Sequence, residues 1–388
     1  MLRVPFALLN RLSYPFTRQA RRQPRSIVVI KPCCLGDLVM TTPLLEVLRR
    51  AYPQARIVYV AGSWSKVIPE HSPAVDAVLD CGSVGISGRY GLQDYLRLAR
   101  MLRHEHFDLA FVLDRSPMLT LLPWLAGVPR RVGLDSLGRG FSLTNRVPVS
   151  SSPDHLQHQA DIYLELAHAI DLPVDQLIDH PHMRFVPTAE ERQAARQLVP
   201  ESKGRVHIAL FPGGGSNPGM ELTAKRWPLA RYRTLASKLV RELDAQVLLI
   251  GGSDDEALNA QLLEGLDVPE GRVRNLAGQT SIGELAALLE RCALFIGNDS
   301  SPMHLAAAVG IPVIAIFGPT SPQEYGPYPL DDPGHIALWR NPTGKPCFFL
   351  GKMQPCADCT CMQAVTGDDV WQAVQRLIPS PQNKEVRS

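Results

Sequence analysis

The sequence has little excess charge and no long apolar run. Its 388 residues carry 40 Lys and Arg against 38 Asp and Glu, a net charge of +2. That total gives no sign of a nucleic-acid-binding protein. No stretch reaches the roughly 20 apolar residues that a membrane-spanning helix needs. The longest run, 305–318, is broken by Gly310 and Pro312, so we expect a helix, a turn and a buried strand there.

Two common nucleotide-binding signatures are also missing. The stretch "PGGGS" at 212–216 is not closed by Gly-Lys-Ser/Thr, so it is not a P-loop. Pro218 stands where a dinucleotide fingerprint needs its last glycine. This argues against a nicotinamide-dependent oxidoreductase.

What the sequence does contain is two series of short apolar strands alternating with amphipathic helices, which predicts parallel sheets covered on both faces. The length also favours two domains. We therefore expect an α/β protein with two doubly wound, Rossmann-like domains facing across a cleft. The expected strands are 27–31, 56–60, 76–79, 108–113, 206–211, 245–251, 293–297 and 312–318. The expected parts are a basic extension at 1–25, domains at 26–185 and 186–367, and a helix and tail at 368–388.

The segment 1–25 is distinctly basic. It holds six arginines and no acid, which leaves 34 bases against 38 acids in the rest of the chain, a charge of −4. Together with its scattered apolar residues, this permits contact with an anionic membrane surface. A disordered extension explains it equally well. It makes a poor signal peptide, so we expect a cytoplasmic protein, with peripheral contact to the inner membrane as one alternative.

A glycine-rich loop follows the strand expected at 206–211. Gly213, Gly214 and Gly215 would let backbone N–H groups approach phosphate oxygens. Lys225 and Arg226 come shortly afterwards and would suit a diphosphate. The simpler interpretation is that the glycine loop has no function and that Lys225 and Arg226 are only surface cations.

Two further strand ends carry polar side chains. In "GNDSSPMHLAAAVG", 297–310, Asp299 and the following serines begin a helix, with His304 one turn on. They either cap the helix or form an anion site at its N-terminus. In "GGSDDE", 251–256, Glu256 and its neighbours either bind sugar hydroxyls or stabilise a helix N-terminus.

Asp37 raises the same question in the first half. It follows the strand expected at 27–31 and the turn that ends at Gly36, at the start of a predicted helix. It is either a helix N-cap or a general base at the carboxyl end of the sheet.

Taken together, these motifs resemble glycosyltransferase family 9, the ADP-heptose:lipopolysaccharide heptosyltransferases. The resemblance runs from about residue 26 to about residue 378. It rests on "LGDLVMTTPLL", "FPGGGSNPGMELTAKRWP", "VLLIGGSDDE" and "NDSSPMHLAAAVGIPVIAIFGPT" in this order. It implies a GT-B fold, a donor site in the C-terminal domain, an acceptor site mainly in the N-terminal one, and transfer with inversion at the anomeric carbon without a metal.

The resemblance also assigns roles. Asp37 would be the base and Lys225 the cation on the donor's diphosphate, with Lys31 in place of a family arginine beside the acceptor. The acceptor site would further include Gly36 and Thr41. The donor site would include Gly214, Gly215, Ser216, Glu256 (ribose), Thr280 (adenine), Asp299, Ser300, Ser301 and His304.

The implied reaction moves a heptose from ADP-heptose to a lipid-linked core saccharide, with no cofactor. In agreement, no two aspartates are separated by one residue, so the Asp-x-Asp motif of metal-dependent sugar-nucleotide transferases is missing. The alternatives are a family 9 transferase that uses a different nucleotide sugar or a polysaccharide acceptor, and a protein that binds a nucleotide sugar without turnover.

Four cysteines cluster near the C-terminus. Their spacing comes close to paired C-x2-C zinc motifs without matching them. We favour buried thiols over a zinc site, and expect disulfides to be the exception in a cytosolic protein. The four are Cys347, Cys356, Cys359 and Cys361.

Overall fold

The computed structural model describes residues 23–86, 88–200, 204–217, 220–349, 352–353 and 360–378. Within them the chain forms two compact units, one ending at His182 and the other beginning at Met183. The expected boundary lay three residues later. Most of the basic extension, residues 1–22, lies outside the described residues, as does 379–388 of the expected tail.

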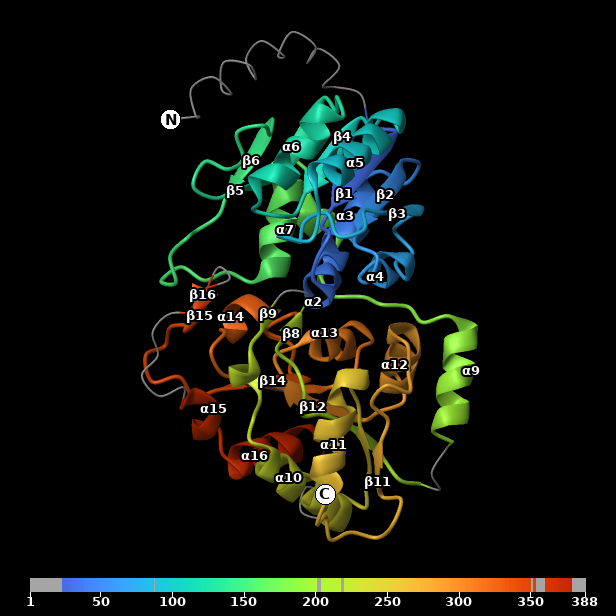
Figure 1. Cartoon of the computed structure of the whole chain (residues 1–388), viewed down its shortest axis with the longest axis vertical. Helices are drawn as coiled ribbons and strands as arrows, with labels where there is room; N and C mark the ends of the chain where they lie inside the picture. The colour runs from blue at the N-terminus through green and yellow to red at the C-terminus, as the bar shows by residue number, and fades with distance from the viewer. Residues whose placement is uncertain are drawn as a thin grey trace. The chain divides into compact units, whose positions relative to one another are not determined.

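The first unit is built on a parallel sheet of six strands (Figure 1). In chain order these are β1 Ser26–Ile30, β2 Arg56–Ala61, β3 Ala77–Asp80, β4 Leu109–Val112, β5 Arg130–Asp135 and β6 Asn145–Pro148. Their order across the sheet is β3-β2-β1-β4-β5-β6. The helices are α2 Leu35–Val39, α3 Thr42–Ala51, α4 Val67–Glu70, α5 Leu92–His104, α6 Pro117–Leu125, α7 Gln159–His168 and α8 Val174–Leu177.

The second unit repeats this plan. Its six parallel strands are β7 His207–Phe211, β10 Gln246–Leu249, β11 Val273–Asn275, β12 Leu294–Asn298, β13 Val313–Phe317 and β14 His335–Trp339. They lie in the order β11-β10-β7-β12-β13-β14. The larger helices are α9 Ala189–Leu198, α10 Leu229–Leu243, α11 Glu256–Leu263, α12 Ile282–Leu289, α13 Ser301–Ala308 and α16 Gly367–Leu377. Short elements complete it: β8 Ser216–Asn217, β9 Met220–Glu221, β15 Phe348–Phe349, β16 Lys352–Met353, α14 Pro322–Tyr325 and α15 Cys361–Ala364.

Both sheets therefore have the doubly wound order, in which the first strand of the unit pairs with its second and its fourth strands. Ligands of such sheets bind outside the carboxyl ends of these strands, where the order reverses. In the first unit this point lies between β1 and β4, and in the second between β7 and β12. The expected α/β fold is confirmed, and so are the eight expected strands. The four other strands of the two large sheets, β5, β6, β11 and β14, were not expected, nor were the short strands β8, β9, β15 and β16.

The helix expected from residue 37 to residue 51 is instead two helices. Pro43 has no N–H group for the helix ladder, and α3 begins around it. The hydroxyls of Thr41 and Thr42 compensate by donating to the carbonyl oxygens of Leu38 and Val39, each at 2.7 Å. This break leaves α2 as a short separate helix directly after β1. None of the described helices is long and apolar enough to cross a membrane.

Candidate active site

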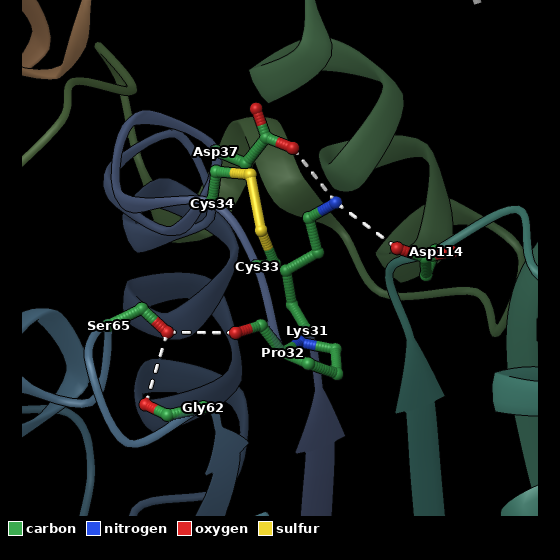
Figure 2. Close-up of a disulfide and its surroundings, with 8 residues drawn as sticks. All are labelled: Lys31, Pro32, Cys33, Cys34, Asp37, Gly62, Ser65 and Asp114. Atoms are coloured by element: carbon green, nitrogen blue, oxygen red, sulfur yellow. Dashed lines mark hydrogen bonds and ion pairs between the residues drawn. A yellow bond between two sulfur atoms is a disulfide. The ribbon is translucent and has the colours of Figure 1, made fainter. Parts of the chain in front are cut away.

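In the first unit, Lys31 lies between two carboxylates at the end of the sheet. Its ammonium is 2.9 Å from Asp37 Oδ2 and 3.3 Å from Asp114 Oδ2 (Figure 2). Lys31 directly follows β1, Asp37 lies in α2, and Asp114 comes two residues after β4. The three residues thus mark the point where the strand order reverses.

The two carboxylates decide the charge of the lysine. Burial on its own lowers the pKa of Lys31, but attraction to Asp37 and Asp114 outweighs it, and the pKa lies well above the usual value. The lysine is buried, whereas the side chains of Asp37 and Asp114 are 33% and 26% exposed. The site therefore presents two accessible carboxylates on a buried cation.

Asp37 is not the N-cap of its helix. The N-cap is Cys34, and no side chain caps α2. Asp37 lies in the first turn, where the helix dipole favours a negative charge, and its carboxylate extends to Lys31 (Figure 2). The capping interpretation of Asp37 is therefore wrong, and its carboxylate is available for other chemistry.

Two predicted acceptor contacts lie close by. Gly36 belongs to α2, and its carbonyl accepts a hydrogen bond from the Met40 N–H. Thr41 is fully buried; its hydroxyl donates to Leu38 and is 3.1 Å from the Tyr59 hydroxyl. In this structure Thr41 stabilises the junction of α2 and α3, and its contact with an acceptor stays a prediction.

A disulfide joins Cys33 and Cys34, the two residues directly before α2 (Figure 2). We expected reduced thiols, so this pairing differs from the sequence-based expectation. Both cysteines are half-buried, three to four positions before Asp37. The disulfide therefore lies directly before the helix that carries the candidate base.

In the second unit, Lys225 and Asp299 form the central pair. Lys225 Nζ lies 2.7 Å from Asp299 Oδ2, and the Thr320 hydroxyl donates to the same oxygen at 2.5 Å. Asp299 is buried, directly after β12, and Lys225 ends a single turn of 3-10 helix at 223–225. Asp299 thus fixes the position of a partly accessible cation.

The glycine loop packs against the start of α13. Gly214 has φ +109°, and a Cβ there would be 3.2 Å from the Cβ of Ser300. At Gly215, φ is +77°, and a Cβ would be 2.1 Å from the Leu222 carbonyl oxygen. Both positions therefore require glycine. Ser216 continues into β8 and is exposed.

The start of α13 lies at the same point. Ser300 is the N-cap residue in extended conformation, and its side chain makes no capping hydrogen bond. Ser301 is the first helical residue and Pro302 follows it. Asp299, which holds Lys225, directly precedes this N-terminus, and a helix N-terminus beside a cation is an arrangement that suits an anion. His304 is buried within α13, so its contact with the donor stays a prediction.

The other predicted donor residues lie one strand further along the sheet. Glu256 begins α11 and is exposed, and its carboxylate lies against Gly278, where a Cβ would be 2.3 Å from Oε1. Thr280 follows two residues later and is half-buried.

Asp255, which precedes Glu256, instead lies against Gly213 and accepts a hydrogen bond from the Gly252 N–H at 3.0 Å. Burial raises the pKa of Asp255.

Asn298 organises this site, and the sequence analysis missed it. It is fully buried, and its amide nitrogen donates to the carbonyls of Pro212 and Gly213 at 2.9 and 2.8 Å. Its oxygen accepts from the Trp227 N–H and the Tyr232 hydroxyl, both at 3.0 Å. One side chain therefore joins the glycine loop, the segment after Lys225 and β12. Its position just before Asp299 at a strand end was the available signal.

Comparisons with known proteins identify the family and the fold. The sequence profile of glycosyltransferase family 9 (heptosyltransferase) matches residues 95–348. The chain belongs to glycosyltransferase family 9. It is 33% identical over 318 residues to the lipooligosaccharide heptosyltransferase 2 of Haemophilus influenzae, covering 80% of this chain and 88% of that protein. It is 32% identical over 308 residues to the lipopolysaccharide heptosyltransferase 2 of Escherichia coli K12, covering 76% and 83%.

Solved structures of family 9 share the fold. The structure of the E. coli ADP-heptose LPS heptosyltransferase II superposes with a TM-score of 0.71 at 25% identity, over 91% of this chain and 98% of that one. The protein is therefore a glycosyltransferase with the GT-B fold, and the expected family and enzyme class are confirmed. A nucleotide-sugar-binding protein without turnover is set aside.

The cysteine cluster is only partly described. Cys347 is half-buried and Cys361 is buried, while Cys356 and Cys359 lie outside the described residues. Among the residues with described positions, no group of three or more His, Cys, Asp or Glu side chains is arranged to hold a metal ion. The zinc alternative at this cluster stays a prediction.

Proposed function

We propose that this family 9 glycosyltransferase moves a heptose from ADP-heptose to a lipid-linked core saccharide of lipopolysaccharide. The relatives support this substrate class, since they include heptosyltransferases 2 of lipopolysaccharide and lipooligosaccharide and, among the solved structures, an ADP-heptose heptosyltransferase. The observation that carries the proposal in this chain is the Lys225–Asp299 pair beside the glycine loop, since it offers a held cation and free N–H groups to a diphosphate.

In the proposed reaction, an acceptor hydroxyl attacks the anomeric carbon of the heptose on the face opposite the diphosphate. The Asp37 carboxylate takes the hydroxyl proton as the new C–O bond forms. The bond from the anomeric carbon to the diphosphate oxygen breaks, and ADP leaves with the electron pair. The configuration at that carbon is thereby inverted.

Lys31 and Asp114 support this proton transfer. When Asp37 becomes protonated, its attraction to Lys31 falls. Asp114, at 3.3 Å, then keeps the lysine paired, so the buried cation is never left without a carboxylate. On this proposal Lys31 is a positioning residue as well as a neighbour of the acceptor.

The leaving diphosphate gains negative charge as the bond breaks. Lys225, the N–H groups of Gly214 and Gly215, and the N-terminus of α13 with Ser300 and Ser301 would stabilise it without a metal. Glu256 and Thr280 would contact the ribose and the adenine. The absence of Asp-x-Asp from the sequence supports a metal-independent reaction. We place the reaction in the cytoplasm, with the 1–25 segment as one candidate for inner-membrane contact.

The experiment that tests the proposal is calorimetric binding of ADP-, UDP-, GDP- and CDP-linked sugars to the purified protein without added metal, followed by transfer to a heptose-deficient lipopolysaccharide core. We expect selective binding of ADP-heptose, and heptose in the product with inverted anomeric configuration. Selective binding of another nucleotide sugar would replace heptose, and retained configuration would rule out the proposed role of Asp37.

A further inference from the structure

Helix α5 in the first unit has one buried face and one unusual exposed face. Its buried residues are Tyr95, Leu98, Ala99 and Leu102, which belong to the core of the first unit. The Tyr95 hydroxyl donates to the Met118 carbonyl at 2.7 Å and so joins α5 to the first turn of α6, which lies beside it (Figure 1). The remaining side chains of α5 point outward.

The outward face carries apolar side chains where polar ones are the rule. In the part of the chain that the structure describes, seven large apolar side chains are exposed, and four of them lie on α5 or the first turn of α6. These are Leu92 (70% exposed), Leu96 (36%), Met101 (37%) and Met118 (40%). A group of exposed apolar side chains marks an interaction site more often than single scattered residues do.

Three of these four side chains lie on one side of α5, whereas Met101 lines a separate cavity on the opposite side. Leu92 and Met118, from different helices, line a single shallow cavity of about 340 Å³. Leu96 follows Leu92 by one helical turn and lies on the same side of α5. We call Leu92, Leu96 and Met118, with the arginines described next, the α5 patch.

Arginines continue the same side of the helix. Arg100 and Arg103 follow Leu96 at intervals of four and three residues, and both are exposed. Neither forms an ion pair with any described residue. From Gly88 to His104 the sequence holds four arginines and one acid, Asp94, which caps α5 by accepting from the Gly91 N–H. Arg97 and Asp94 line a separate cavity on the opposite side of the helix, so Arg100 and Arg103 are the arginines that lie beside the apolar side chains.

We propose that the α5 patch docks on the anionic surface of a phospholipid bilayer. The choice of partner rests on the two kinds of side chain together. Unpaired guanidinium groups bind lipid phosphates, and leucines beside them enter the boundary between headgroups and acyl chains. The patch lies on helices of the first unit and belongs to a different part of the sequence from the basic segment 1–25. It adds a membrane contact to the proposed function and does not depend on which nucleotide sugar the enzyme uses.

The test is co-sedimentation of the full chain with vesicles of equal parts phosphatidylcholine and phosphatidylglycerol, and with phosphatidylcholine alone. We expect binding to the anionic vesicles that weakens as salt rises. The double variant Arg100→Gln/Arg103→Gln should bind about 25-fold more weakly, at roughly fivefold per arginine near an anionic surface. Leu92→Ser/Leu96→Ser should bind at least about tenfold more weakly while keeping its salt dependence.

The matched control is Arg196→Gln/Arg376→Gln, which removes two exposed arginines from the second unit. It should bind as the native protein does. A Leu96→Trp variant places a tryptophan in the patch. Its fluorescence emission should shift to shorter wavelength when anionic vesicles are added, and brominated acyl chains should quench that emission. All the substituted side chains are exposed, so thermal unfolding should be unchanged.

Three results would overturn the proposal. The first is equal vesicle binding by the native chain and both patch variants. The second is an equal loss in the control variant, which would mean that only total charge matters. The third is a native dimer in sedimentation velocity that the patch variants abolish while vesicle binding persists, because the patch would then join two copies of the chain. Donor binding by calorimetry should be unaffected in all variants, which separates failure here from failure of the proposed function.

Discussion

Lys225 Nζ and Asp299 Oδ2 lie 2.7 Å apart, although 74 positions separate the two residues in the chain. The Thr320 hydroxyl donates to the same carboxylate oxygen. The ion pair holds the lysine ammonium in place, and on the proposed mechanism the two residues act together on the diphosphate.

Asp299→Asn should therefore imitate Lys225→Met. Both substitutions should lower kcat/KM by about 100-fold, because a displaced or absent cation no longer stabilises the leaving diphosphate. Steady-state kinetics with ADP-heptose measures this. The Arg196→Gln variant is the control, and full activity in Lys225→Met would remove the lysine from the mechanism.

Asp37→Asn should abolish transfer and leave ADP-heptose affinity nearly unchanged, since a base acts in the transition state. We expect kcat to fall by at least about 100-fold. The control is Glu46→Gln, which removes only the ion pair with Arg50 on α3. If donor affinity fell along with the rate, Asp37 would belong to donor binding instead.

Lys31 should stabilise the fold over a wide range of pH. Its folded pKa lies above its ordinary value of about 10.4. The stabilisation is fully present below that ordinary value and is lost only as the pH rises through the folded pKa. Lys31→Met should thus lower the free energy of unfolding by about 1–3 kcal/mol at neutral pH, since it leaves two partly buried carboxylates together.

Urea unfolding of the native and Lys31→Met proteins across the pH range measures this difference, which should stay constant at neutral pH and shrink only in strongly alkaline solution. Lys66→Met, which removes a surface pair with Asp80, should cost less than about 1 kcal/mol. A difference that shrank on going from pH 7 to pH 9 would contradict the assigned direction of the pKa.

Asn298→Ala should destabilise the protein by about 3 kcal/mol or more. It leaves the Pro212 and Gly213 carbonyls without a donor and the Trp227 N–H without an acceptor in a fully buried site. Unfolding experiments would show this, and donor affinity should fall as the glycine loop loosens. Asn341→Ala, in an exposed turn, is the control, and similar stability in both variants would refute the organising role of Asn298.

The cysteines should divide into distinct reactivity classes. Burial raises the pKa of both the Cys81 and the Cys292 thiols to about 12, so neither should react with an alkylating reagent in the folded protein at about pH 8. Cys33 and Cys34 should be blocked until a reductant opens their disulfide. Peptide mass spectrometry, with and without reductant, measures each site, and alkylation of Cys33 without reductant would show that the pair is reduced.

The elements that could be predicted were those with a strong local signal. Continuous apolar runs identified β1 and β7, and helix-start residues identified α13. The break at Pro43 was visible as a proline, but a single amphipathic pattern ran across it. The strand β14, "HIALW", is short and only partly buried at an edge of the sheet, so its pattern was too weak to recognise.

The site residues likewise divide into those with a local signal in the sequence and those without one. Asp37, Lys225 and Asp299 stood out because they follow strands or a glycine loop. Asp114 follows the expected strand 108–113 in the same way and was overlooked. Its pairing with Lys31, across 83 positions, arises only when β1 and β4 become neighbours. Asn298 stood at a strand end beside Asp299, but its role was missed because its partners lie in distant segments of the chain.

The repeated strand order has a consequence for how such enzymes diversify. Each unit has its own core and carries its polar side chains at the same topological position, beyond the first and fourth strands. Changes that alter recognition of one substrate can therefore accumulate in one unit while the other keeps its residues. Chimeras that join the first unit of one relative to the second unit of another are a natural route to new saccharide linkages made from an unchanged donor.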